Sequence, residues 1–386
     1  MSQGPGEFLR LIRSGEATTR GELLAATGMS RISVAQRVDA LLAAGVIRPA
    51  GDGGATGGRR SVRFVFEPAT VALVAALEVD SGLLAVVDAH GIVHARLDLD
   101  THVADGPEAT LRRVADGFSR LMAEHDVPAE RVIAMGVSVP GPIDPTTGRL
   151  EEPPIMPGWG GWPITETLQE FLDVPVYVEN DADAMAYGEW SRGRALPGRP
   201  LVLVKASEYI GAGLVIDGKI YRGLDGGAGD IGHVPIGGHR LCRCGRTGCL
   251  ASEASGRAVL DRLAEQGLDE ADLTDLTELA ARAEAGDAAV AATLRHAGEQ
   301  IGRVLGSVAA VMNPAMIVIA GTLQSVTLVA AIRSAVYATA LPRATRHLEI
   351  TTDTLHRDCA PVGLARVAFD GEYAPAAVDA RLENET

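Results

Sequence analysis

The feature that most constrains the fold of this 386-residue chain is a change in hydrophobic periodicity at Glu67-Pro68. Before this dipeptide, apolar residues recur at the three- and four-residue spacing of helices; after it, short apolar runs between turn residues are typical of strands. A chain of this length generally holds two or three domains. The sequence therefore predicts a small, mainly helical head over residues 1–66 and a larger α/β body.

The head is predicted to contain three helices followed by a hairpin. Helices are expected over residues 7–13, over residues 20–26 with a capping box from Thr19 and Glu22, and after an N-cap at Ser30. The residues of the third helix expected to face inward are Ile32, Val34, Val38, Leu41 and Leu42. Extended segments at 46–49 and 61–66 flank a glycine-rich stretch, 51–58. This order is typical of a winged helix-turn-helix, a DNA-binding module.

Charge is divided unevenly between head and body. Residues 1–66 carry nine arginines and five acidic residues, a net charge of +4, so the rest of the chain carries −19 within a total of −15. A basic head on an acidic body is typical of a DNA-binding module attached to a domain that does not bind DNA. The side chains expected to reach bases or phosphates of double-stranded DNA are Ser30, Arg31, Ser33, Gln36, Arg37, Arg59 and Arg60. The alternative is that the third helix only exposes a solvated face.

The body shows a similar order of elements twice. Strands are expected over 71–79, 83–87 and 92–99, then a helix over 107–125 and a strand over 132–139; a second series begins with strands at 200–204, 213–216 and 219–221. This repetition fits the two-lobed, ribonuclease H-like fold of the actin-like ATPases. We place the first lobe at residues 71–190 and the second at 191–360. The C-terminal helix, near residues 361–386, is expected to rejoin the first lobe.

Three of the four cysteines lie within eight residues, and a histidine precedes them by nine. Three thiolates and one imidazole are the usual ligands of a closed, tetrahedral, structural Zn²⁺ site. The predicted zinc loop spans residues 232–250, with the ligands His233, Cys242, Cys244 and Cys249. The alternative is three reduced cysteines without a metal.

The expected location is the cytoplasm. The first 16 residues contain no continuous apolar segment of the kind that directs export, and no apolar run approaches the ~20 residues of a membrane span. A reducing compartment also favours metal binding over disulfides for the clustered cysteines. The isolated Cys359 is expected to be a small core residue.

Eight stretches resemble one family in their sequence and their order. They read SRISVAQRVDALLAAGVI, TGGRR, GVSVPGPIDPTTGRL, PGWGGWPI, VENDADA, IGAGLVIDG, GGAGDIGHVPI and CRCGRTGCL. Together they cover nearly the whole chain as far as about Gly321. By these motifs the chain resembles the ROK family of repressors, open reading frames and sugar kinases, in its repressor branch with a fused winged helix.

The resemblance implies roles for four residues of the body. In the kinases of the family, the residue matching Asp181 is the general base that takes a proton from a sugar hydroxyl as it attacks the γ-phosphate. The family's sugar contacts match Asn180, Asp230 and His233, and His233 would link the zinc loop to the pocket. A structural role for Asp181, as the N-cap of the helix that follows it, is compatible with the functional one.

Two nucleotide-binding motifs depart from the family's kinase pattern. Where the kinases have Asp-x-Gly-x-Thr, this chain reads Ala76-Leu77-Glu78-Val79-Asp80, and where they have Gly-Thr-Gly-Ile-Gly-Ala-Gly it reads Ser207-Glu208-Tyr209-Ile210-Gly211-Ala212-Gly213. Carboxylates at these positions repel phosphates. We therefore expect no ATP binding and no enzymatic activity, with Asp181 a vestigial base. The sugar pocket is altered less, by Asp230 and Ala251 where the family has glutamates.

The expected function is a DNA-binding transcriptional regulator, most simply a repressor, whose body senses a sugar or sugar derivative. Helix-turn-helix regulators read paired half-sites, which favours a homodimer or homotetramer on operator DNA. One alternative is an active ATP-dependent sugar kinase with an appended DNA-binding domain. Another is a regulator released from DNA by a partner protein.

Overall fold

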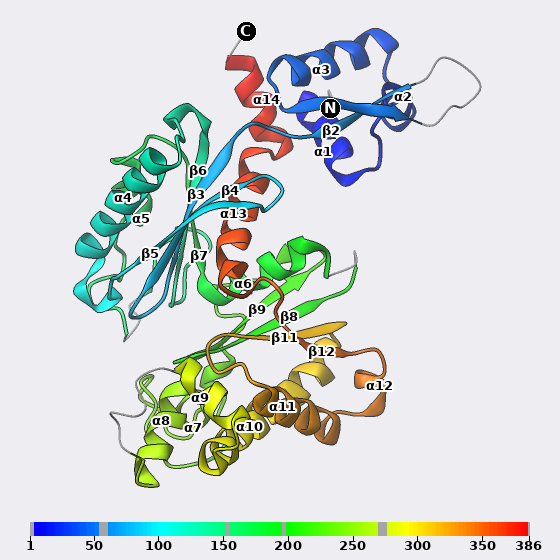
Figure 1. Cartoon of the computed structure of the whole chain (residues 1–386). Helices are drawn as coiled ribbons and strands as arrows, with labels where there is room; N and C mark the ends of the chain where they lie inside the picture. Colours follow the sequence, from blue (N-terminus) through cyan, green and yellow to red (C-terminus); the bar gives the residue numbers. More distant parts are fainter. Residues whose placement is uncertain (1–3, 54–60, 152–154, 195–197, 269–275, 385–386) are drawn as a thin grey trace.

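The computed structural model describes residues 4–53, 61–151, 155–194, 198–268 and 276–384, and it separates a small head from a two-lobed body (Figure 1). The head contains α1 (Pro5–Ser14), α2 (Arg20–Thr27) and α3 (Arg31–Ala43), followed by the antiparallel strands β1 (Ile47–Gly53) and β2 (Ser61–Phe66). This is the order predicted for a winged helix-turn-helix. The predicted wing residues Arg59 and Arg60 lie outside the described residues.

Local capping explains where the helices of the head begin. Thr19 accepts from the Glu22 backbone N–H and the Glu22 side chain reaches back, which completes the predicted capping box. Ser30 caps α3 by accepting from the Ser33 backbone N–H at 3.1 Å. The expectation that Ile32 faces inward is wrong, because its side chain is 73% exposed. Ile32 precedes the buried Val34 by two positions, about 200° around a helix, and therefore lies on the opposite face.

The first lobe is a five-stranded sheet in the order β5-β4-β3-β6-β7. An antiparallel meander of β3 (Val71–Leu77), β4 (Gly82–Asp88) and β5 (Val93–Leu99) continues into the parallel strands β6 (Val132–Val139) and β7 (Val176–Asn180). Helices α4 (Pro107–Glu124) and α5 (Ile164–Gln169) cover one face of the sheet (Figure 1). After β7 the chain enters α6 (Asp181–Glu189) directly.

The second lobe repeats this strand order as β10-β9-β8-β11-β12. Its meander is β8 (Leu201–Ala206), β9 (Ile210–Ile216) and β10 (Lys219–Ile220), and its parallel strands are β11 (Met316–Ala320) and β12 (Glu349–Thr352). The helices of this lobe are α7 (Leu250–Ala254), α8 (Gly256–Glu265), α9 (Leu276–Glu284), α10 (Ala288–Met312), α11 (Val326–Thr339) and α12 (Pro342–Thr345). Two lobes with one strand order confirm the predicted actin-like α/β fold.

The C-terminal helices join the head to the body. From β12 the chain returns through α13 (Cys359–Glu372), which packs on α6, β6 and β3, and ends in α14 (Pro375–Asn384), which packs on α1. One hydrophobic cluster contains Phe8 and Leu41 of the head, Val74 of the first lobe and Phe369 of α13. Head and body are therefore packed together rather than connected only through Glu67-Pro68. None of the described helices combines the length and apolar character that a membrane crossing requires.

Candidate DNA interface, ligand cleft and metal centre

The exposed start of α3 is the candidate DNA interface. Arg31, Ile32 and Gln36 are exposed there, and Ile32 and Gln36, four positions apart, lie on the same stripe. The hydroxyls of Ser30 and Ser33 lie 3.0 Å apart and take part in the helix cap, which leaves them less available to phosphates than the sequence suggested. The predicted residues of α3 thus lie together. Arg31 and Gln36, which are exposed, are best placed to reach a groove of DNA, whereas Arg37 is half-buried.

The head is fastened to α13 through Asp370. Arg13 of α1 forms an ion pair with Asp370 at 2.7 Å and lies over the ring of Phe66, 4.7 Å from its centroid. The other carboxylate oxygen of Asp370 accepts from the Tyr187 hydroxyl of α6 at 2.5 Å and from Arg366 at 2.9 Å. One carboxylate therefore contacts both the head and the helix that begins at the candidate sugar site.

The start of α6 holds two of the predicted sugar contacts. Asn180, not Asp181, is the N-cap: its side-chain oxygen accepts from the backbone N–H groups of Ala182 and Asp183, and its Nδ2 donates to the carbonyl of Gly141 at 3.1 Å. Asp181 is the first helical residue and is 8% exposed. The prediction that Asp181 is the N-cap is therefore wrong by one residue. Asn180 takes this role because its side-chain oxygen accepts from N–H groups of the helix while its side-chain nitrogen donates to a carbonyl of the neighbouring loop.

A buried lysine that the sequence analysis missed neutralises Asp181. Lys205 Nζ, from β8 of the second lobe, lies 2.5 Å from Asp181 Oδ2 and also pairs with Glu78, which follows β3. Burial lowers the pKa of Lys205, but the carboxylates of Asp181 and Glu78 outweigh it and hold the pKa above its ordinary value. The sequence could have indicated the importance of Lys205, because it is one of only two lysines in the chain and interrupts an apolar strand.

The two lobes also meet beside this ion cluster. Arg222, from the loop after β10, pairs with the buried Glu179 of β7. Gly226 in the same loop, at φ +79°, packs so closely on the carbonyl of Ile143 that a Cβ would lie 2.1 Å from its oxygen. The close approach requires glycine, and it brings the 222–230 loop of the second lobe against the strand ends of the first.

Asp230 and His233 follow that loop. Both are exposed, and the His233 backbone N–H donates to the carbonyl of Asp230 at 3.1 Å. Although Asp230 is exposed as a residue, partial burial of its carboxyl group raises its pKa, and His233 lowers the pKa in part. Gly229, next to Asp230, packs on Ala212 of β9, and Gly213 of the same strand packs on Ala182. The structure thus brings Asp230 into the neighbourhood of Asn180 and Asp181 through β9.

The loop 207–213, which matches a phosphate loop of kinases, bonds at Ser207 to two other segments of the second lobe. The backbone N–H of Thr322 donates to Ser207 Oγ at 3.1 Å, and the backbone N–H of Gly256 donates to the Ser207 carbonyl at 2.8 Å. Tyr209 lies under the guanidinium of Arg243, 5.2 Å from the ring centroid. Within the loop, the backbone N–H groups of Ser207 and Ala212 donate to the carbonyls of Tyr209 at 3.1 Å and Gly229 at 3.0 Å, so these two donors are not available to a phosphate.

The predicted metal ligands converge. The ligand atoms of His233, Cys242, Cys244 and Cys249 lie within 4.8 Å of one another, and all three cysteines are free thiols. Cys242 Sγ lies 3.5 Å from His233 Nδ1, and Cys244 Sγ lies 3.7 Å from Cys249 Sγ. Tetrahedral zinc with sulfur ligands at ~2.3 Å separates neighbouring sulfurs by ~3.8 Å. The residues present therefore fit a tetrahedral metal site.

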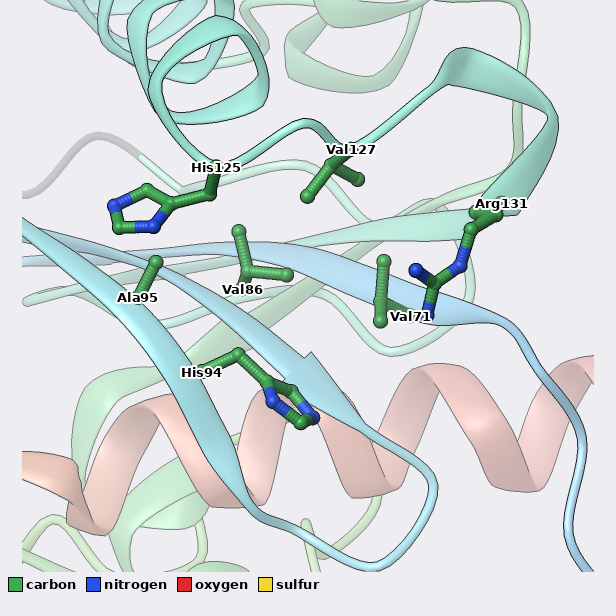
Figure 2. A pocket seen from close by; sticks show the side chains of 7 residues that line it. All are labelled: Val71, Val86, His94, Ala95, His125, Val127 and Arg131. Carbon is green, nitrogen blue, oxygen red and sulfur yellow. The ribbon is translucent and has the colours of Figure 1, made fainter.

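A separate small hollow lies on the first lobe, away from these residues. It has a volume of about 180 Å³ and is lined by the side chains shown in Figure 2, namely Val71, Val86, His94, Ala95, His125, Val127 and Arg131. Its polar side chains are partly occupied: His94 bonds to Asp88 at 2.9 Å, and Arg131 Nε donates to the carbonyl of Ala69 at 2.9 Å. The hollow holds none of the predicted sugar contacts.

Comparison with known proteins identifies the family. The family model described as "ROK family" matches residues 82–370. The chain belongs to the ROK family. This confirms the resemblance drawn from the sequence motifs.

Relatives of two kinds are similar to this ROK protein. The xylose repressor of Bacillus spizizenii is 27% identical over 372 residues, which cover 94% of this chain and 94% of the repressor. The glucokinase of Halalkalibacterium halodurans is 28% identical over 296 residues, which cover 72% of this chain and 89% of the kinase. A match over 94% of the chain includes most of the head, whereas the kinase match leaves more than a quarter of the chain uncovered.

A solved structure supports the same architecture. The crystal structure of a ROK family transcriptional regulator, titled a homolog of the Escherichia coli MLC protein, superposes with a TM-score of 0.81 and covers 98% of both chains. Its sequence is 21% identical, so the likeness shows the fold. The likeness in fold therefore extends over both the head and the body.

Proposed function

We propose that this ROK protein is a DNA-binding transcriptional regulator that represses genes of carbohydrate uptake or use, and that its body senses a sugar or sugar derivative without phosphorylating it. The observation that carries the regulatory part is the head, whose third helix exposes Arg31 and Gln36 and whose core is continuous with the body. The repressor relatives named for xylose and N-acetylglucosamine support a sugar effector. Paired half-sites favour a homodimer or homotetramer.

DNA binding is tested with point variants, because removing residues 1–66 would expose the apolar surface of α13 and α14. Arg31→Ala should weaken binding to a specific genomic fragment by about 1–3 kcal/mol if Arg31 contacts a base. The control is Arg112→Ala, an exposed arginine of α4 paired with Glu108 at 2.8 Å, which removes the same charge from the body. Equal affinities of the two variants across salt concentrations would refute the assignment of α3.

The absence of kinase activity rests on the ion pair of Asp181 with Lys205. A general base works on a sugar hydroxyl only when its carboxylate is free to accept the proton and when nucleotide and magnesium are in line. Lys205 Nζ lies 2.5 Å from Asp181 Oδ2. In the loop 207–213, the backbone N–H groups of Ser207 and Ala212 already donate to carbonyls of the protein. A coupled ATPase assay with xylose, glucose and N-acetylglucosamine should show no sugar-dependent turnover. Turnover that Asp181→Asn abolishes would instead establish the kinase alternative.

The role proposed for the loop 232–250 is to hold one structural Zn²⁺ with His233, Cys242, Cys244 and Cys249. Burial, and then the neighbouring thiols, raise the pKa of Cys249 to about 12, so without a cation this thiol stays protonated. When bound, the metal ties the loop together, and His233 positions the stretch that begins at Asp230. Cys244→Ala should release the zinc and reduce the sugar-induced shift in melting temperature. Protein that binds DNA and responds to sugar with zinc near zero would contradict this role.

A further inference from the structure

Three buried side chains with metal-ligating atoms meet where the second lobe returns to the first. Glu189 ends α6, Asp353 follows β12, and Cys359 begins α13; one ligand atom from each lies within 4.8 Å of the others. They are 0%, 5% and 1% exposed, in that order. None belongs to the loop 232–250 or to the proposed sugar and DNA sites.

Asp353 presents an unsatisfied oxygen in this cluster. Its side chain is 3% exposed, and Oδ1 is buried without a hydrogen-bond partner among the described residues. The nearest imidazole nitrogen, His356 Nδ1, lies 3.7 Å from Oδ1, beyond hydrogen-bonding distance. A buried carboxylate oxygen beside a second carboxylate is unfavourable unless a cation or a proton accompanies it.

The other two side chains are held in place by neighbouring backbone. The Glu189 carboxylate accepts from the backbone N–H groups of Thr354 at 2.7 Å and Leu355 at 2.9 Å. The Cys359 thiol donates to the carbonyl of Met185 at 3.1 Å and lies 3.9 Å from Glu189 Oε1. Cys359 is the first residue of α13, and burial, followed by the carboxylates of Glu189 and Asp353, raises the pKa of its thiol well above the ordinary value.

We propose that Glu189, Asp353 and Cys359 form a second metal site, and that it binds Zn²⁺. A set of one thiolate and two carboxylates favours Zn²⁺ over Ca²⁺ and Mg²⁺, which take oxygen ligands alone. Binding forms a zinc–sulfur bond and releases the thiol proton of Cys359 to solvent. The cation would fasten α6, which begins at Asp181, to the start of α13. The proposal does not depend on DNA binding.

The test counts zinc in the full-length protein, stripped with a chelator and dialysed against micromolar free Zn²⁺. Wild type should hold two zinc ions per chain, and Asp353→Asn or Cys359→Ser should hold one. The control Asp358→Asn makes the same chemical change at a half-buried carboxylate that pairs with Arg96 outside the cluster, and should keep two. Asn and Ser preserve the shape of the buried side chains, and circular dichroism checks that the variants fold.

A loop variant separates the two sites. Cys242→Ser combined with Cys244→Ser should leave one zinc ion, and adding Cys359→Ser should remove it. With Co²⁺ in place of Zn²⁺, the loop variant should show thiolate-to-metal charge transfer that disappears when Cys359 is also replaced. A single zinc in wild type that the loop variant loses, or two zinc ions retained by Asp353→Asn, would overturn the proposal.

Discussion

Replacing Lys205 by methionine tests the ion cluster that joins the lobes. The change removes a cation whose side chain is 7% exposed. It leaves the side chain of Asp181, which is 12% exposed, beside Glu78 without a partner cation. Breaking a buried pair by removing one partner costs about 3–5 kcal/mol. We expect a loss near the lower end, because Glu78 is 46% exposed and remains hydrated.

A second variant measures the coupling within the pair. Because Lys205→Met with Asp181→Asn leaves no buried charge, the double variant should be more stable than Lys205→Met alone. Compared with the single variants Lys205→Met and Asp181→Asn, the double variant should give an interaction energy between the two side chains of about 2–3 kcal/mol. Urea unfolding followed by tryptophan fluorescence reports on this region, because all three tryptophans, Trp159, Trp162 and Trp190, precede the second lobe.

The matched control is Lys219→Met, since Lys219 is the chain's other lysine and lies exposed on β10. It should change the unfolding free energy by less than about 0.5 kcal/mol. Equal destabilisation by Lys205→Met and Lys219→Met, or simple additivity of the Lys205 and Asp181 changes, would refute the reasoning.

Three further variants test other parts of the account. If Ile32 packs on the methyl group of an operator thymine, Ile32→Ala should weaken operator binding at least about fourfold, the effect of removing one buried carbon group from the contact. In fluorescence anisotropy, the variant should also lose the effect of replacing that thymine by uracil. Asp370→Asn neutralises the partner of Arg13 and should bring the operator affinities measured with and without sugar closer together. An unchanged ratio of these affinities would exclude Asp370 as the link between α6 and the head. Burial, and then the charge of Glu179, raises the pKa of Asp183 in the folded protein. The protonated carboxyl therefore contributes its full stability below the unfolded pKa of 3.8, and this contribution is lost as the pH rises through the folded pKa. Asp183→Asn should therefore be more stable than wild type in urea at pH 7, with the gap closing towards pH 4; greater stability of wild type at pH 7 would contradict this.

Periodicity was sufficient for the elements whose partners are close in sequence. The meander of β3, β4 and β5 and the cap at Ser30 follow from alternation and from side chains within a few positions. The convergence of His233 with Cys242, Cys244 and Cys249 was equally accessible, because the spacing of these residues confines them to one loop. The prediction that Ile32 faces inward was wrong because apolar character alone does not fix the orientation of a side chain. Its position on the helix relative to the buried Val34 places it on the opposite face.

Contacts between segments far apart in the chain could not be predicted from the sequence. Lys205 pairs with Glu78 across 127 positions, and Arg13 pairs with Asp370 across 357. Nothing in local pattern says which of 50 acidic residues a buried cation will meet. The duplicated topology sets the pairing of Lys205 with Glu78, since it places the turn after β3, the start of α6 and the end of β8 together.

The most direct test of a body that senses without phosphorylating follows operator occupancy by fluorescence anisotropy. The sugar that most stabilises the protein in a thermal-shift screen of monosaccharides, amino sugars and disaccharides is added first alone, then with Mg²⁺-ATP, and is recovered for mass spectrometry. The account predicts a change in occupancy with sugar alone, no further change with ATP, and sugar recovered unmodified. A response that requires ATP, or accumulation of sugar phosphate, would contradict it.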